Sequence, residues 1–255
     1  MSKQLLIYTR AQAVSSQRHR EWSVKSGGTY EFAREVNSIP LTAVEFMSAA
    51  GEYPIVFAGS DEQLMPLAVM GMRDKENLFI DADGKLDATY VPAFLRRYPF
   101  VFSSQDDGNN FTLCIDETFS GCNQENVGER LFDSEGEQTQ YLKGVLAFLK
   151  EYQVHFARTQ AFSKKLKELG LLEPMGAQFT QPSGEKLTLT GFYAVNRQKL
   201  KELPTEELEQ LVKNDGMELI YLHLHSLRNF NTMLGKIGIE ESDAGVSEEE
   251  VETVA

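Results

Sequence analysis

Residues 87–102 constrain the fold more than any other stretch of the chain; they read DATYVPAFLRRYPFVF. Seven of these sixteen residues are aromatic or proline, and they surround the only adjacent pair of arginines, Arg96 and Arg97. Pro92 suits the first turn of a helix, where a missing N–H is tolerated, whereas Pro99 cannot continue one. The stretch therefore predicts a short helix over residues 90–97 that turns at Pro99 into a buried strand.

Part of this pattern occurs twice. Residues 98–102 (YPFVF) echo residues 53–57 (YPIVF), and an amphipathic segment precedes each copy. Before the first copy, Thr42 and Glu45 have the spacing of a capping box and predict a short helix that ends at Gly51. A five-residue echo is too short to establish a duplication, so an internal repeat and a chance likeness both stay open.

The rest of the N-terminal half reads as strands joined by turns. Side chains that alternate between apolar and polar predict a strand over residues 21–25, with a returning strand over residues 29–33. The apolar run at residues 64–72 predicts a central strand that pairs with the one before it. The same patterns predict further strands at residues 55–58, 77–80, 100–103 and 111–116.

The C-terminal half has helical spacing. Apolar residues recur at helical intervals over residues 138–169, and a break near residues 158–163 leaves one long helix or two consecutive ones open. A hairpin over residues 177–180 and 186–195 follows. Three further helices are predicted, capped by Asn196, Thr205 and Asp215, the last of them over residues 217–235.

These patterns predict an α+β protein with a mostly antiparallel sheet packed against C-terminal helices. We expect one domain over residues 1–236, with a strand-rich half at about 22–116 and a helix-rich half at about 137–235. Residues 237–255 carry seven acidic residues and no basic one, a composition typical of a disordered tail.

Composition narrows the classes of function. Without the seven acidic residues of the tail the net charge of −13 becomes −6, and an acidic chain repels phosphate backbones, so nucleic-acid binding is not expected. No apolar run approaches the roughly 18–20 residues of a membrane span, and the N-terminus lacks the long apolar region of a signal peptide. Two cysteines, Cys114 and Cys122, are expected to stay reduced. We therefore predict a cytoplasmic protein.

Common catalytic and cofactor motifs are missing from the sequence. It has neither of the usual glycine-rich phosphate loops and no G-x-S-x-G or H-E-x-x-H motif. His223 and His225 lie two positions apart, so on a helix they point about 200° from each other and could not easily share a metal. We predict no metal, no cofactor and no catalytic residue, and a structural role for these histidines.

The arginine pair is the strongest candidate for binding. Arg96 and Arg97 could form a fork-shaped anchor for a carboxylate or phosphate, framed by Tyr90 and Tyr98, and Arg73 could lie on the same side of the sheet. The alternative is a solvated helix face whose arginines pair with neighbouring acids. The candidate ligand-binding residues are Arg73, Tyr90, Arg96, Arg97, Tyr98 and His223.

Several blocks of sequence, in order, resemble the SapC-like family of bacterial proteins. They are IPL with EF (39–41, 45–46), YPIVF (53–57), NLF with DG (77–79, 83–84), YVPAFLRRYPF (90–100), CID (114–116), LF (131–132), GF (191–192) and HLHSL (223–227). The resemblance covers most of residues 19–234. The family name refers to a surface layer, and a peptide-transporter permease shares the label, but a chain without a membrane span does not fit the permease.

The resemblance implies an accessory role rather than a defined reaction. Members are often encoded beside flavin-dependent halogenase-like and cupin-like proteins, which would be candidate partners. We therefore expect a non-enzymatic binding or accessory protein that acts with a partner protein or peptide, and a homo-oligomer is compatible with the sequence. The alternatives are a surface-layer component and an enzyme with an unrecognised site, for example at Arg73, Arg96, Arg97, Tyr98 and His223.

Overall fold

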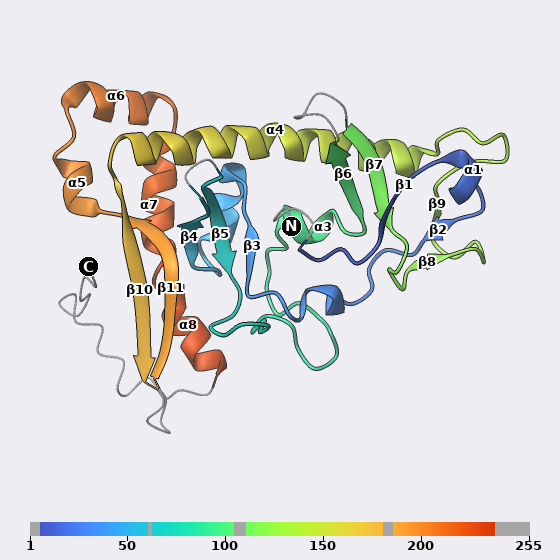
Figure 1. Cartoon of the computed structure of the whole chain (residues 1–255), viewed down its shortest axis with the longest axis horizontal. Helices are drawn as coiled ribbons and strands as arrows, with labels where there is room; N and C mark the ends of the chain where they lie inside the picture. The colour runs from blue at the N-terminus through green and yellow to red at the C-terminus, as the bar shows by residue number, and fades with distance from the viewer. Residues whose placement is uncertain (1–5, 61–62, 105–110, 181–185, 238–255) are drawn as a thin grey trace.

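One long helix runs along the molecule and packs on two separate groups of strands. The computed structural model describes residues 6–60, 63–104, 111–180 and 186–237. The long helix, α4 (Gln140–Glu168), has 29 residues and begins where the Thr139 hydroxyl accepts the Leu142 N–H. At 1.5 Å per residue it is about 44 Å long. Figure 1 shows it above both groups of strands. Of the two alternatives that the sequence left open, one long helix is therefore correct.

The larger sheet has five strands in the order β10-β11-β4-β5-β3. Its centre is the hairpin of β4 (Ile55–Ala58) and β5 (Met65–Val69), as predicted, and β3 (Ser38–Pro40) pairs with β5 at one edge. The long hairpin of β10 (Leu172–Thr180) and β11 (Lys186–Val195) joins the other side through Tyr193 and Phe57. All these pairings are antiparallel, and the predicted strand-rich and helix-rich halves share this sheet.

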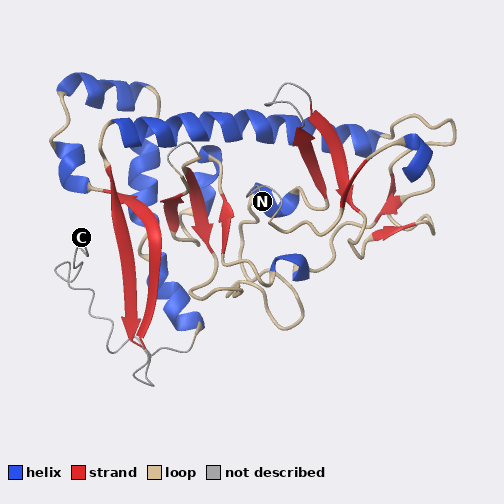
Figure 2. Ribbon diagram, in the orientation of Figure 1, coloured by secondary structure: helices blue, strands red, loops and turns tan. Residues whose placement is uncertain are grey.

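Helices from the C-terminal part cover the larger sheet (Figure 2). Helix α7 (Gly216–Ser226) contacts β4, β11 and the short helix α2 (Phe46–Ala49), which follows the 3-10 turn η3 (Ala43–Glu45). Helix α8 (Asn229–Lys236) closes the same core through Phe230, Met233 and Leu234. The remaining helices of this region are α5 (Arg197–Lys201) and α6 (Thr205–Lys213). The predicted α+β class is confirmed.

Two small sheets lie under the N-terminal half of α4. One contains β1 (Ala11–Ala13), β7 (Phe111–Asp116) and β6 (Phe100–Ser104), and the other contains β8 (Cys122–Asn123), β2 (Ser23–Val24) and β9 (Glu129–Arg130). A second apolar core joins them to α4, with Phe100, Ile115, Leu142 and Leu149 among its buried members. The short helices here are α1 (Ser16–His19), η2 (Glu31–Ala33) and α3 (Ala93–Arg96).

Two predicted strands are wrong. Residues 29–33 form η2 rather than a strand that returns along β2, because β2 already pairs with β8 on one side and β9 on the other. Residues 77–80 form a turn in which the Asn77 side chain accepts the Phe79 N–H and donates to the Ala33 carbonyl. A side chain that bonds the local backbone in this way competes with strand pairing.

The predicted helix ends also need correction. The expected helix over residues 217–235 is two helices, α7 and α8, with the Asn229 amide donating to the carbonyls of Ala50 and Tyr53 where α8 begins. Asp215 occupies the cap position of α7 as predicted, but its side chain makes no capping hydrogen bond, and Asn214 accepts the Gly216 N–H. Pro204, not Thr205, occupies the cap position of α6. Asn196 caps α5 as predicted. The connections between the strands predicted at 100–103 and 111–116 and between the two arms of the hairpin at 177–195, and the acidic tail beyond residue 237, lie outside the described residues.

Within the described ranges no helix combines the length and apolarity needed to cross a bilayer. Helix α4 contacts both groups of strands, and one domain over residues 1–236 stays a prediction. We expect urea unfolding to be a single transition, because neither part can lose its contacts with α4 independently of the other. Trp22, the only tryptophan, packs on the core beneath the N-terminal half of α4, whereas the far-ultraviolet circular dichroism signal reports all the helices. The two signals should give the same midpoint; two separated midpoints would mean two domains.

Candidate functional site

Residues 95–100, which belong to the stretch 87–102, line a cavity of the described chain. It has a volume of about 500 Å³ and three walls. The first wall is the loop of residues 26–30 with Phe32, and the second is residues 95–100 with Phe119. The third is one face of α4 near its start, where Tyr141, Gly144, Val145 and Phe148 have the spacing of neighbours on a helix.

The buried carboxylate of Glu45 holds the stretch of residues 87–102 in place. Glu45 accepts hydrogen bonds from the N–H and the hydroxyl of Thr42, at 2.8 and 2.7 Å, which makes the predicted capping box. Its other oxygen accepts the Ala93 N–H at 2.7 Å and the Tyr90 hydroxyl at 2.9 Å. The 3-10 turn η3, which leads into α2, therefore fixes the start of α3. Helix α3 continues through a cis peptide bond between Tyr98 and Pro99 into β6.

The two adjacent arginines have different environments. Arg97 is 2% exposed, and its guanidinium lies over the rings of Phe94, Tyr152 and Tyr8, at 4.3, 5.0 and 5.7 Å from their centroids. Burial raises the pKa of Tyr8 above its ordinary value, although the neighbouring Arg97 opposes that rise. Arg97 is therefore part of the core, where its charge rests on aromatic faces.

Arg96 is exposed at the cavity. Its Nε donates to the Val91 carbonyl at 3.0 Å, and its guanidinium lies 5.4 Å from the centroid of the Phe148 ring. Among the residues that the structure describes, no carboxylate forms an ion pair with it. Of the predicted arginine pair, Arg96 is the member that can meet a ligand.

Aromatic rings form the base of the cavity around Tyr98. The Tyr98 ring stacks on Phe32 at 4.0 Å between centroids and meets the edge of Phe119 at 5.3 Å. Burial, followed by the nearby Asp116 charge, raises the pKa of Tyr98 above its ordinary value. Tyr98 is therefore a neutral, fixed ring.

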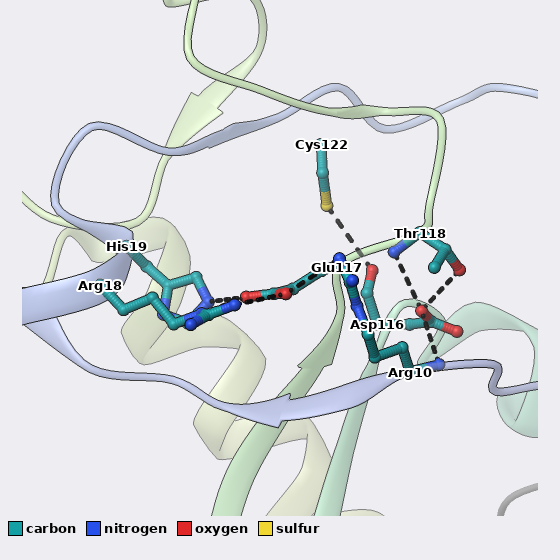
Figure 3. A network of polar contacts seen from close by, with 7 residues as sticks. All are labelled: Arg10, Arg18, His19, Asp116, Glu117, Thr118 and Cys122. Atoms are coloured by element: carbon teal, nitrogen blue, oxygen red, sulfur yellow. Dashed lines mark hydrogen bonds and ion pairs between the residues drawn. The ribbon is translucent and has the colours of Figure 1, made fainter.

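A polar network beside the cavity anchors the N-terminal arm and the turn that carries Phe119. Figure 3 shows Arg18 and His19 directed at the Glu117 carboxylate, with Thr118 and the Arg10 backbone at Asp116. The side chain of Arg10 adds an ion pair to Glu117 at 3.2 Å. Burial lowers the pKa of His19, whereas the hydrogen bond from Arg18 lowers the pKa of Glu117.

This network is best explained as structural. The Glu117 side chain is 1% exposed, and its oxygens face two guanidinium groups and one imidazole. Asp116 accepts the Thr9 N–H at 2.7 Å and the Thr118 hydroxyl at 2.7 Å. Burial raises the pKa of Asp116, but the hydrogen bonds that it accepts lower the pKa by more, so the pKa lies below its ordinary value. Both carboxylates are thus ionised and occupied, and they fix the turn that leads to Phe119.

The remaining predicted site residues lie elsewhere. Arg73 is exposed and pairs with Glu76 at 2.9 Å. His223 is fully buried on α7, between the Ile55 carbonyl and the Val195 N–H. Tyr90 is not among the lining residues of the cavity, and its hydroxyl donates to Glu45. The six predicted residues therefore do not form one site: Arg96, Arg97 and Tyr98 line the cavity, and Arg73 and His223 do not.

The sequence pattern missed the wall that α4 contributes. One signal was available, because Gly144 lies inside a 29-residue helix where alanine would be more favourable by about 1 kcal/mol. A Cβ atom placed on Gly144 would meet nothing within 4 Å, so no close contact requires the glycine. The space that it leaves open belongs to the cavity.

Comparisons with known proteins identify the family. The family model SapC matches residues 14–233, which includes every element that lines the cavity. Searches of curated proteins and of solved structures find no match. Since the match covers most of the chain and contains the blocks that carry the resemblance, the chain belongs to the SapC family.

Proposed function

We propose that this protein is a non-enzymatic binding protein that acts with a partner protein or peptide, and that its cavity accepts an aromatic group of that partner. The observation that carries the proposal is the composition of the cavity wall. Seven of its residues are aromatic, two are arginine, and no His, Cys, Asp or Glu is present among the described lining residues. Such a wall suits burial of a ring better than proton transfer, which needs an acid or base in reach.

The size of the cavity supports this proposal. A volume of about 500 Å³ lies within the range of about 300–1,000 Å³ that is usual for ligand sites. An aromatic side chain can bury roughly 150–250 Å², which corresponds to a gross gain of about 4–6 kcal/mol before the costs of association. A single inserted ring would therefore give measurable but modest affinity.

Gly144 supports the proposal independently of the wall's composition. It is exposed, and a side chain there would project into the cavity without touching another part of the protein. Glycine at this position lowers the stability of the helix, and the structure shows no contact that requires it, only open space. We therefore take the space itself as the functional feature.

The test is selection of peptides from a displayed random library. We expect peptides bound by the wild-type protein to share an aromatic residue at one position. The same peptides should lose at least tenfold in affinity for Gly144→Phe, because the new ring occupies the cavity. The matched control is Ala157→Phe, since Ala157 is exposed on the same helix but outside the cavity wall.

Two results would contradict the proposal. One is a selection that yields no shared aromatic position, and the other is a set of peptides that bind Gly144→Phe and wild type equally. Circular dichroism should show that Gly144→Phe is folded, because nothing in the structure obstructs the new side chain. The proposal includes a cytoplasmic location, which the two free thiols, Cys114 and Cys122, support.

A further inference from the structure

We propose that the group bound in the cavity is an aromatic carboxylate: a planar ring among the aromatic side chains, with its carboxylate on Arg96. This inference rests on the proposed binding function and adds the chemical class of the ligand. The same chemistry occurs in a peptide that ends in an aromatic residue and in a small aromatic acid.

The charge of the cavity points to an anion. Arg96 is the exposed charged residue among its described lining, and no Asp or Glu belongs to that lining. Arg97 is committed to the rings of Phe94, Tyr152 and Tyr8. The exposed guanidinium of Arg96 is therefore the group that faces an incoming ligand.

Arg96 is held in position before a ligand arrives. One of its five N–H donors, Nε, bonds the Val91 carbonyl at 3.0 Å. The Phe148 ring, 5.4 Å away, supports its flat face. Donors that remain on the guanidinium can hold a carboxylate, and a guanidinium that is already positioned loses less freedom on binding.

The ring and the carboxylate must be close together in the ligand. Phe148 contacts Arg96 and also lines the cavity, so the anion site borders the aromatic wall directly. Gly144 and Tyr141, the preceding residues on the same face of α4, extend that wall away from Arg96. A ring one or two bonds from its carboxylate, as in a C-terminal phenylalanine, fits this arrangement.

The experiment compares four defined probes by two-dimensional amide NMR titration of the full chain. They are N-acetyl-phenylalanine, its amide, N-acetyl-leucine and the acetylated peptide Gly-Gly-Gly-Phe with a free carboxylate. We expect the wild-type protein to bind the phenylalanine acid about tenfold more tightly than the amide, because the charged hydrogen bonds are lost. The leucine acid should bind less tightly than the phenylalanine acid, because it lacks the ring.

Two variants identify the anion site. Arg96→Gln should reduce the ratio of acid to amide affinity to about one, because the fixed cation is gone. Arg158→Gln should leave the ratio unchanged, since Arg158 is exposed on α4 outside the cavity wall and the two variants change the net charge equally. Peptide binding stronger than that of the single residue would identify a chain terminus as the source, and equal binding would identify a small acid.

The outcomes separate this inference from the binding function. If acid and amide bind equally and Arg96→Gln has no effect, the ligand class is wrong while an aromatic binding site stands. If the phenylalanine acid does not bind at all, the ligand class is also wrong. The binding function itself fails only if the peptide selection finds no aromatic position that depends on Gly144.

Discussion

Replacing Arg97 with alanine should lower the free energy of unfolding by about 3–4 kcal/mol, whereas replacing the adjacent Arg96 should change it by less than about 0.5 kcal/mol. Arg97 is 2% exposed and contacts three aromatic faces, so its removal leaves a cavity and deletes cation–π contacts at the same time. Arg96 is exposed, and its contacts with Val91 and Phe148 are at the surface.

Urea unfolding of the two alanine variants measures this difference, and each variant is the control for the other. Arg97→Lys should recover only part of the loss, because an ammonium group does not stack on rings as a flat guanidinium does. Similar stabilities for the Arg96 and Arg97 alanine variants would show that the aromatic cage contributes little. The opposite order would show that Arg96, rather than Arg97, is the structural member of the pair.

Local signals in the sequence were sufficient for the elements that surround the site. The capping box of Thr42 and Glu45 needs only residues three positions apart, and it is present in the structure. The hairpins of β4 with β5 and of β6 with β7 follow from neighbouring apolar runs. These features depend on interactions within short stretches, so spacing alone predicts them.

The site itself depends on contacts between distant segments, which spacing cannot supply. Its walls come from residues 26–32, 95–100 and 140–148, and Phe119 adds to them from a turn anchored by Asp116. The sequence also gives no basis for separating Arg96 from Arg97, because one step along a helix of four residues decides which guanidinium is buried. Both arginines line the cavity, and which guanidinium is exposed there follows only from the fold.

The errors have a common physical cause. Residues 29–33 and 77–80 have apolar residues at spacings that suit strands, but their hydrogen bonds go to turns. Asn77 bonds the backbone at Ala33 and Phe79, and Tyr30 donates its N–H to the Gly84 carbonyl. Hydrogen bonds to partners that are distant in sequence, Ala33 for Asn77 and Gly84 for Tyr30, helped to determine the structure of these two segments. The apolar pattern alone therefore could not predict it.

His223 was predicted to be structural, and its contacts explain why it should make stability depend on pH. Its Nε2 accepts the Val195 N–H at 3.0 Å, so Nδ1 carries the proton and donates to the Ile55 carbonyl at 2.7 Å. Protonation of Nε2 would place two donors against each other. Burial lowers the pKa of His223 to about 4, although the Ile55 hydrogen bond opposes this.

The direction of the pH effect follows from this shift. The pKa of an unfolded histidine is about 6.5, so between about pH 6.5 and pH 4 the unfolded chain binds a proton that folded His223 does not. The contribution to stability is therefore fully present above pH 6.5 and is lost as the pH falls towards 4. At about 1.4 kcal/mol per pH unit, the loss between pH 6.5 and pH 5 is about 2 kcal/mol.

Urea unfolding of wild type and His223→Gln at pH 7 and pH 5 measures this contribution, because carboxylates that titrate in the same range affect both proteins equally. At pH 7 the wild type should be the more stable protein, and its advantage should shrink by about 2 kcal/mol at pH 5. His225→Gln is the matched control, since His225 is exposed two residues away on the same helix. An advantage that stays constant for His223 would mean that the folded protein binds the proton as readily as the unfolded chain, and Nε2 could then not be the acceptor of the Val195 N–H.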